Sequence, residues 1–270
     1  MHAEPIDITA EMTARDAFRA IAYATLRHFS GNAEGVRALD AESVHQMRVG
    51  LRRLRAAISL FDDILPGPST TRIKKELKWL TGELAAAREL DVFLAERIKP
   101  LGRASSPKRG FRAIEKHFSA RRHTAFQKAR DALASPRYRR LLIDLLEWLS
   151  LRNGRDVETS NMPIGDFAAA LMQRRTRKAR KEGRHLNQLS PRERHKLRIK
   201  IKKIRYALDF FRNLYPSKAS SRNFPRASKR RARRAQRLYR PPLIGGGCRI
   251  ECDSQGPPGP RLCIGLAGRA

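Results

Sequence analysis

The chain has 270 residues, of which 58 are Lys or Arg and 26 are Asp or Glu, so its formal net charge is +32. A hydrophobic share of 41% argues against disorder throughout, and the length allows one large domain or two small ones. Glu4, Asp7 and Glu11 interrupt any apolar leader, and no apolar stretch of about twenty residues occurs. We therefore expect a soluble cytoplasmic protein whose charge attracts polyanions, namely nucleic acid, acidic membrane or a phosphate polymer.

The apolar pattern predicts an all-α chain from about residue 10 to residue 216, because strand signals are nearly absent. Helices are expected near residues 10–30, 42–65, 70–98, 109–134, 137–152 and 164–184, with a last one from residue 191. Proline at 66, 68 and 100 is expected to end the second and third helices. The run Ser190-Pro-Arg-Glu193 is a capping box that starts the last helix.

One pattern of charged residues occurs twice, 150 residues apart. The run His45-Gln-Met-Arg-Val-Gly-Leu-Arg-Arg-Leu-Arg55 is repeated as His195-Lys-Leu-Arg-Ile-Lys-Ile-Lys-Lys-Ile-Arg205. In each copy a His and three cations follow the spacing i, i+3, i+7 and i+10, which places them within about 80° on one helix face. Like charges at this spacing repel by a few tenths of a kcal/mol per pair. Their recurrence therefore favours a face that holds an anion over an ordinary solvated face.

Apolar residues form a neighbouring arc of about 100° in both copies and are expected to face a core. They are Val44, Met47, Leu51, Leu54, Ile58 and Phe61 in the first copy, and Leu197, Ile201, Ile204, Leu208 and Phe211 in the second. The internal repeat implies two related helical bundles about a pseudo-two-fold axis, with the basic edges facing each other.

The two runs resemble the signature helices of the CHAD domain, the conserved histidine α-helical domain family. Residues 42–55 are similar to the family's leading motif and residues 195–206 to its second. Lys74, Lys75 and Lys78, followed by Ala-Arg-Glu-Leu-Asp-Val at 87–92, resemble the helix after the first signature. The resemblance covers about residues 10–216. It implies a domain of two helical bundles that enclose a basic surface or pore and bind inorganic polyphosphate.

Recognition of this polymer needs cations along a path, because polyphosphate carries about one charge per internal phosphate and has no bases to read. The candidate binding residues are His45, Arg48, Arg52, Arg53, Arg55, Lys74, Lys78, Arg88, Arg174, Lys178, Lys181, His195, Arg198, Lys202, Lys203 and Arg205. The two histidines are expected in the first turn of their helices, where N–H groups favour anions, with tighter binding below about pH 6.5. The lysines and arginine at 74, 78, 174, 178 and 181 equally fit a solvated helix face.

Catalytic motifs are missing from the sequence. No Gly-rich phosphate loop, H-E-x-x-H, G-x-S-x-G or metal-binding carboxylate cluster occurs, so we expect neither an enzyme nor a cofactor or metal. The alternative is a non-specific nucleic-acid-binding protein, for which the charge would suffice. Aromatic residues are only 7%, and no RNA-recognition motif or zinc finger weighs in its favour. The expected location is the cytoplasm, with polyphosphate granules as a candidate site.

The composition changes after Pro216. Residues 217–270 hold 13 Lys or Arg against two acids, together with a Gly run at 245–247 and a Gly/Pro run at 256–260. We expect this tail to be mostly disordered. A second copy of the helix at 74–92 is expected after Pro216, yet residues 224–242 show no such pattern. This predicts an incomplete second half, truncated or replaced as a frameshift would do. Cys248, Cys252 and Cys263 match no zinc or redox spacing and are expected to be incidental.

Overall fold

The computed structural model describes residues 1–104, 109–150 and 158–214, and in these ranges the chain is helical. The only strand-like feature there is an isolated bridge between Thr13 and Pro163. The all-α expectation is therefore confirmed. The basic tail with its cysteines lies outside the described residues, as does the place where a second copy of the helix at 74–92 would follow.

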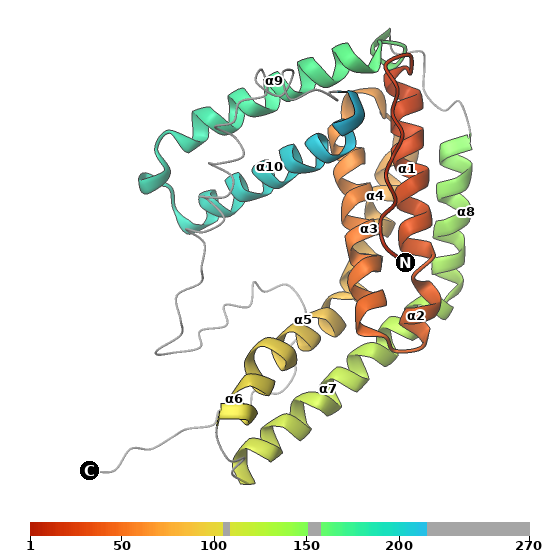
Figure 1. The fold of residues 1–270 in the computed structure, drawn as a ribbon. Coiled ribbons are helices and arrows are strands. Elements are labelled where there is room, and N and C mark those ends of the chain that lie inside the picture. The colour runs from red at the N-terminus through yellow and green to blue at the C-terminus, as the bar shows by residue number, and fades with distance from the viewer. Residues whose placement is uncertain (105–108, 151–157, 215–270) are drawn as a thin grey trace.

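Ten α-helices occur in the described ranges (Figure 1). They are α1 (Ala14–Ser30), α2 (Ala33–Arg37), α3 (Ala41–Leu60), α4 (Pro68–Glu83), α5 (Ala85–Phe93), α6 (Lys99–Ala104), α7 (Arg109–Ala134), α8 (Pro136–Ser150), α9 (Ile164–Gly183) and α10 (Pro191–Phe210). Short 3-10 turns η1 (Asp62–Ile64) and η5 (Arg212–Leu214) follow α3 and α10. Six of the seven predicted helices lie within a few residues of an observed one, and the short α2 was not predicted.

The third predicted helix, 70–98, is wrong as a single unit. Leu84 has φ −85° and ψ −4°, which separates α4 from α5. A π-helical turn over Leu94–Ile98 then leads into α6, so the chain stays helical past Pro100. Pro100 directly follows the π-helical turn, where the regular i to i−4 hydrogen-bond pattern of the α-helix is already interrupted.

The core is built from α1, α3, α4, α8 and α9, and Phe61 stands at the centre of a group of aromatic rings within it. The centroid of its ring lies 5.4 Å from that of Phe18, 4.9 Å from Phe167 and 6.0 Å from Phe211. Each buried Phe contributes about 1.5–3 kcal/mol through the apolar surface removed from water. Residues from both copies of the repeat thus share one core.

The predicted apolar arcs are buried to different extents. All six residues of the first arc are fully buried on α3, which packs against α1, α4, α5 and α10. In the second arc Leu197, Ile204 and Phe211 are buried, while Ile201 and Leu208 are half-buried. Within the described residues, α10 packs mainly against α9 and α3, so less of its apolar face is covered.

Two backbone hydrogen bonds connect two pairs of equivalent positions in the repeat, Met12 with Met162 and Ala14 with Ile164, in a crosswise manner. Ala14 N donates to Met162 O at 2.9 Å, and Ile164 N donates to Met12 O at 3.0 Å. This reciprocal exchange is what a two-fold relation between α1–α3 and α9–α10 would produce. We keep the pseudo-two-fold axis as our interpretation of the repeat.

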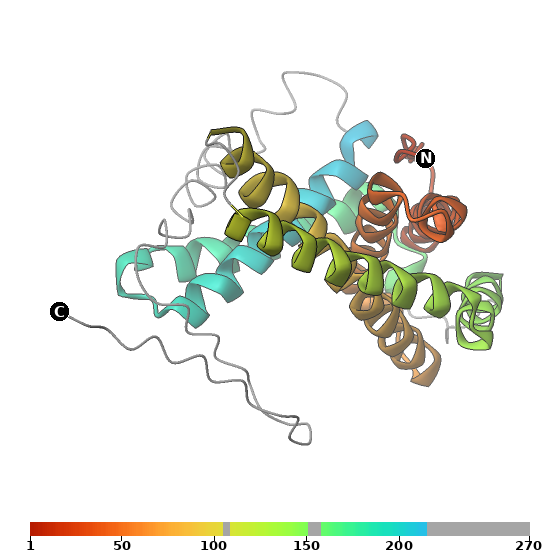
Figure 2. The same cartoon turned by 90° about the horizontal axis from the view of Figure 1, so that it is seen from below.

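The helices project from the body in two directions. Figure 1 shows the α9–α10 hairpin extending to one side of α1 and α3, and α5, α6 and the start of α7 extending below them. Figure 2 shows the same arm, built from α5 and α7, seen from below. Phe93 and Phe118 pack inside this arm with centroids 4.7 Å apart. No helix in the described ranges is both long and apolar enough to cross a membrane.

Candidate anion-binding site

The two basic helix faces meet where α10 packs against α3. Arg52 of α3 and Arg198, Lys202 and Arg205 of α10 approach one another there. Partial burial, and then the charges of Arg198, Arg52 and Arg205, lower the pKa of Lys202. Lys202 is therefore repelled by three arginines from two helices, and a bound multivalent anion would relieve this repulsion.

Three further residues extend this group along α3 and α5. Burial and then the charge of Arg88 lower the pKa of His45, with Arg52 and Arg48 adding to the effect. We call these seven residues the central cluster. Its members are His45, Arg48, Arg52, Arg88, Arg198, Lys202 and Arg205. Glu42 and Glu89 are its acidic neighbours, since the charge of Glu42 opposes the shift at His45 and that of Glu89 the shift at Arg48.

Arg48 is partly committed to the fold. Its Nη1 donates to Thr81 O at 2.9 Å, which ties α3 to the last turn of α4. Its Nε is buried and makes no hydrogen bond within the described part of the chain. Burial, and then the charge of Arg52, lowers the pKa of Arg48, but a guanidinium stays charged at neutral pH. An anion that reached Nε would give it the partner that it lacks here.

The expected first-turn position of the two histidines is wrong. His45 and His195 are each the fifth residue of a helix, because α3 begins at Ala41 and α10 at Pro191. Side chains already cap part of each first turn, since Asp40 accepts from Ser43 N at 2.7 Å and Ser190 accepts from Glu193 N at 3.3 Å. The anion-binding role of these helix N-termini therefore falls away.

A second group of cations surrounds the carboxyl end of α3. Lys74 Nζ lies 2.5 Å from Asp62 Oδ1, and Arg174 Nη2 lies 2.5 Å from Asp63 Oδ2. Arg175 Nη2 donates to Ser59 O at 2.6 Å, and Lys203 Nζ donates to Ser59 Oγ at 2.7 Å. We call this group the end cluster: Asp62, Asp63, Lys74, Arg174, Arg175 and Lys203.

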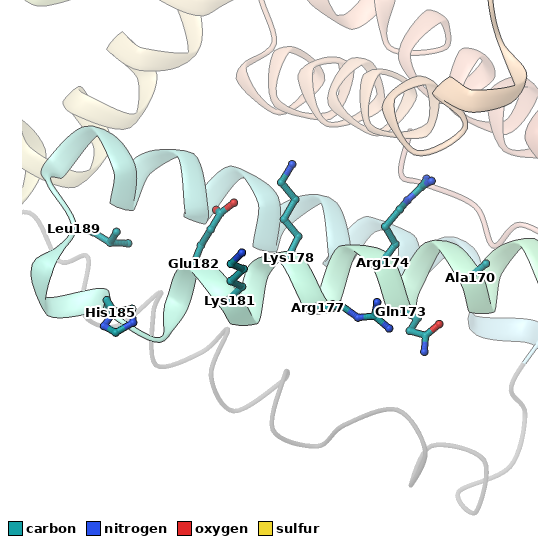
Figure 3. Close-up of a pocket in the computed structure, with 9 residues that line it drawn as sticks. All are labelled: Ala170, Gln173, Arg174, Arg177, Lys178, Lys181, Glu182, His185 and Leu189. Atoms are coloured by element: carbon teal, nitrogen blue, oxygen red, sulfur yellow. The ribbon is translucent and has the colours of Figure 1, made fainter.

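A third group follows one side of α9, where a hollow of about 850 Å³ is lined by Gln173, Arg177, Lys181 and His185 among others (Figure 3). Arg174 and Lys178 also border it, although Figure 3 shows them pointing to the opposite side of the helix from Gln173 and Arg177. All these cations are exposed. This hollow is the weaker candidate site, because an exposed helix face carries such charges without any ligand.

Comparison with known proteins identifies the family of this chain. The CHAD domain family matches residues 20–238. The chain belongs to the CHAD family. A crystal structure of the CHAD domain from the plant Ricinus communis is 31% identical, with a TM-score of 0.69, and the match covers 88% of this chain and 78% of that one. PptA from Streptomyces chartreusis is 19% identical, with a TM-score of 0.58 and coverage of 87% and 89%, and supports the fold alone. A comparison with curated proteins finds no match.

The CHAD structure does not bring all the predicted residues together. His195 is exposed on α10, five residues into the helix. Lys78 is exposed on α4, and Arg53 lies 5.4 Å from the ring centroid of Phe210. Arg55 is exposed on α3, where its charge acts on Lys203 of the end cluster. In the described residues no group of three or more His, Cys, Asp or Glu could hold a metal ion. The functions of these side chains remain predictions.

Arg175 is the site residue that the sequence analysis missed. It is half-buried and lies between α9 and the end of α3. In the repeat, position 175 corresponds to Thr25 of the first copy, which is buried. A cation at a position that is buried in the other copy is the sequence signal that could have identified Arg175. Charge at a core position of an amphipathic helix is typical of an interhelical contact.

Proposed function

We propose that this CHAD chain binds inorganic polyphosphate without catalysis and that the central cluster is its principal binding surface. The CHAD family is associated with polyphosphate binding in general. The observation that carries the proposal is the convergence of Arg52 on α3 with Lys202 and Arg198 on α10, where burial and like charges lower the pKa of the lysine.

The ligand class follows from the charges and from their arrangement. A linear phosphate polymer can contact cations on both helices at once, whereas a single phosphate neutralises only one part of the cluster. Arginine offers forked donors to neighbouring phosphate oxygens, and lysine adds a point charge. Within the described residues no exposed row of aromatic rings lies between these cations, as single-stranded nucleic acid would require.

The decisive experiment is a titration of the chain with long-chain polyphosphate at about 150 mM salt, where non-specific contacts are weakened. The variant combines Arg52→Gln, Arg198→Gln, Lys202→Gln and Arg205→Gln. Its matched control, Arg112→Gln, Lys128→Gln, Arg130→Gln and Arg139→Gln, removes the same charge from exposed positions on α7 and α8. We expect the cluster variant to lose about 100-fold or more in affinity and the control to lose much less, because only the former removes converging contacts.

Competition with duplex DNA and RNA of equal phosphate content separates the polymer classes. If nucleic acid displaces the bound polyphosphate as effectively as unlabelled polyphosphate does, the result would support the nucleic-acid alternative. Equal losses in the two variants would show that net charge, and not the central cluster, binds the polymer. An assay of orthophosphate release during the same titration tests the non-catalytic part of the proposal, and steady release would contradict it.

Polyphosphate granules are the cellular destination that such binding favours. A fluorescent fusion of the full chain should gather at granules, and the four-residue cluster variant should stay dispersed. Colocalisation that survives in the variant would indicate recruitment by another part of the chain.

A further inference from the structure

The exposed half of the end cluster neutralises itself. Asp62 and Asp63 are consecutive in η1, and each holds a cation from a different helix, Lys74 of α4 and Arg174 of α9. The side chains of the two pairs are 44–60% exposed, so water and dissolved anions reach them. The net charge of these four residues is zero, although the two cations stand among the candidate binding residues.

The more buried half of the end cluster is also satisfied within the protein. Arg175 and Lys203 both donate to Ser59, one to its backbone oxygen and the other to its hydroxyl. These contacts lie at the carboxyl end of α3, where the helix dipole favours cations. Burial, and then the charge of a neighbouring arginine, lowers the pKa of both Arg175 and Lys203. Asp62 and Asp63 oppose this shift at Arg175, and Asp62 opposes it at Lys203, so the acids partly offset the repulsion here.

Three cations of the central cluster differ from Lys74 and Arg174 of the end cluster in their counter-ions. Within residues 1–104, 109–150 and 158–214, Arg52, Lys202 and Arg205 form no ion pair with a carboxylate. Neighbouring residues of α10 therefore face different surroundings: Arg52 and Arg198 act on Lys202, whereas Arg175 and Asp62 act on Lys203.

The acids also break the symmetry of the repeat. The positions 150 residues after Asp62 and Asp63 hold Arg212 and Asn213, in the corresponding turn η5. Asn213 Nδ2 donates to Ile6 O at 3.1 Å and has no charge to offer. The acidic pair thus follows the first signature helix and is absent from the equivalent place after the second.

We propose that Asp62 and Asp63 are internal counter-ions that close the end cluster to polyphosphate and confine the polymer to the central cluster. This inference rests on the proposed function. A polymer near Lys74 or Arg174 would have to displace a carboxylate and would then be repelled by it, because like charges at such distances repel even in water. At Arg52 and Lys202 the polymer relieves a repulsion instead.

Lysine footprinting tests where the polymer lies. The full chain is acetylated with an amine-reactive reagent, with and without long-chain polyphosphate, and the rate at each lysine is measured by mass spectrometry. In the wild type we expect polyphosphate to slow acetylation of Lys202 about tenfold and to leave Lys74 unchanged, since only phosphate-contacted cations are shielded. Lys128, exposed on α7, is the reference.

The double variant Asp62→Asn and Asp63→Asn removes the counter-ions. We expect polyphosphate to protect Lys74 from acetylation in this variant and the affinity for polyphosphate to rise roughly three- to tenfold. The slope of log affinity against log salt concentration should steepen by the amount that up to two additional phosphate contacts cause. Glu34→Gln combined with Glu76→Gln is the matched control, because it removes two acids that pair with Arg37 and Arg137 elsewhere. Circular dichroism and thermal unfolding check that each variant folds, and the two single variants replace the double one if it does not.

The outcomes separate this inference from the proposed function. Protection of Lys74 and Lys202 alike in the wild type would overturn the inference while leaving polyphosphate binding intact. So would an Asp62/Asp63 variant with the affinity, salt dependence and footprint of the wild type or of the control. If polyphosphate protects no lysine in the wild type, the proposed function is overturned and the inference with it.

Discussion

Two consecutive lysines of α10 show how strongly the surroundings of a side chain decide its role. Lys202 faces Arg52, Arg198 and Arg205, while Lys203 donates to Ser59 Oγ at the end of α3. A step of one residue rotates the side chain by about 100° around the helix, which is enough to place the two lysines on different sides of the contact with α3. A count of basic residues would treat both alike, although the ammonium group of Lys203 already donates to a partner within the protein.

His45 predicts a dependence of polyphosphate affinity on pH. Burial and nearby arginines, Arg88 foremost, hold the pKa of His45 below its usual value of about 6.5 in the free protein. A bound polyanion favours the protonated ring and so raises this pKa. As pH falls, the affinity for polyphosphate should therefore begin to rise near the pKa of His45 in the complex. It should level off only below the lower pKa that His45 has in the free protein.

The measurement is the dissociation constant of polyphosphate between pH 8 and pH 5, compared between the wild type and His45→Gln. We expect the glutamine variant to lose most of the pH dependence of polyphosphate affinity. Uptake of one proton on binding changes the affinity by up to about tenfold when binding shifts the pKa of the group by one unit. An unchanged pH profile in the variant would assign the effect to another group. The control is His123→Gln, a change of an exposed histidine on α7.

At the level of the helices, close approach decides where glycine is required. A Cβ on Gly50 of α3 would lie 2.8 Å from Phe29 Cβ and 2.9 Å from Phe29 N in α1, so alanine cannot fit unless the two helices move apart. A Cβ on Gly82 of α4 would meet no atom within 4 Å. The same substitution is thus expected to have opposite effects at these two positions.

Gly50→Ala should lower the free energy of unfolding by about 1–2 kcal/mol, because the cost of overpacking exceeds the gain in helix propensity. Gly82→Ala should raise it by about 0.5–1 kcal/mol, since alanine restricts the unfolded chain. Urea unfolding followed by circular dichroism measures both changes. A stabilised Gly50→Ala protein would contradict the close packing of α1 on α3.

At the scale of the whole molecule, the site depends on how the α9–α10 hairpin sits on the first part of the chain. Phe61, Phe167 and Phe211 join the two parts through the core, and Arg175 and Lys203 join them at the end of α3. Between these contacts the cations of α3 and α10 repel one another. A polymer that contacts both helices should therefore stabilise the whole arrangement.

Thermal unfolding provides the test. Long-chain polyphosphate at about 100 times its dissociation constant should stabilise the chain by up to about 2.7 kcal/mol, less whatever the unfolded polycation binds. A gain of about 2 kcal/mol corresponds to a rise in Tm of roughly 4–8 °C for a protein of this size. Pyrophosphate at equal phosphate content should give a much smaller rise, because it cannot reach both helices. Equal shifts with the two ligands would show that bridging plays no part.

Much of the fold could be predicted from local patterns. The period of the apolar residues located most helices, and the six residues of the first arc are all buried. The capping box at Ser190 and Glu193 is present as the sequence indicated. The break at Leu84 and the helix continuing past Pro100 could not be read in this way, because they depend on how α5 and α6 pack and on a π-helical turn that no simple period encodes.

By itself, the sequence determined the helical class, the two basic faces 150 residues apart, and the family to which the chain belongs. Only the tertiary structure decided which cations lie close together and which are paired within the protein. It placed Arg52 beside Lys202, paired Lys74 with Asp62 and Arg174 with Asp63, and directed Lys203 to Ser59. The physical reason is one of range, since hydrophobic periodicity and capping act over a few neighbouring residues. The partner of a charge depends on how separate helices pack against each other, and in three of these four contacts the residues are more than a hundred positions apart in the chain.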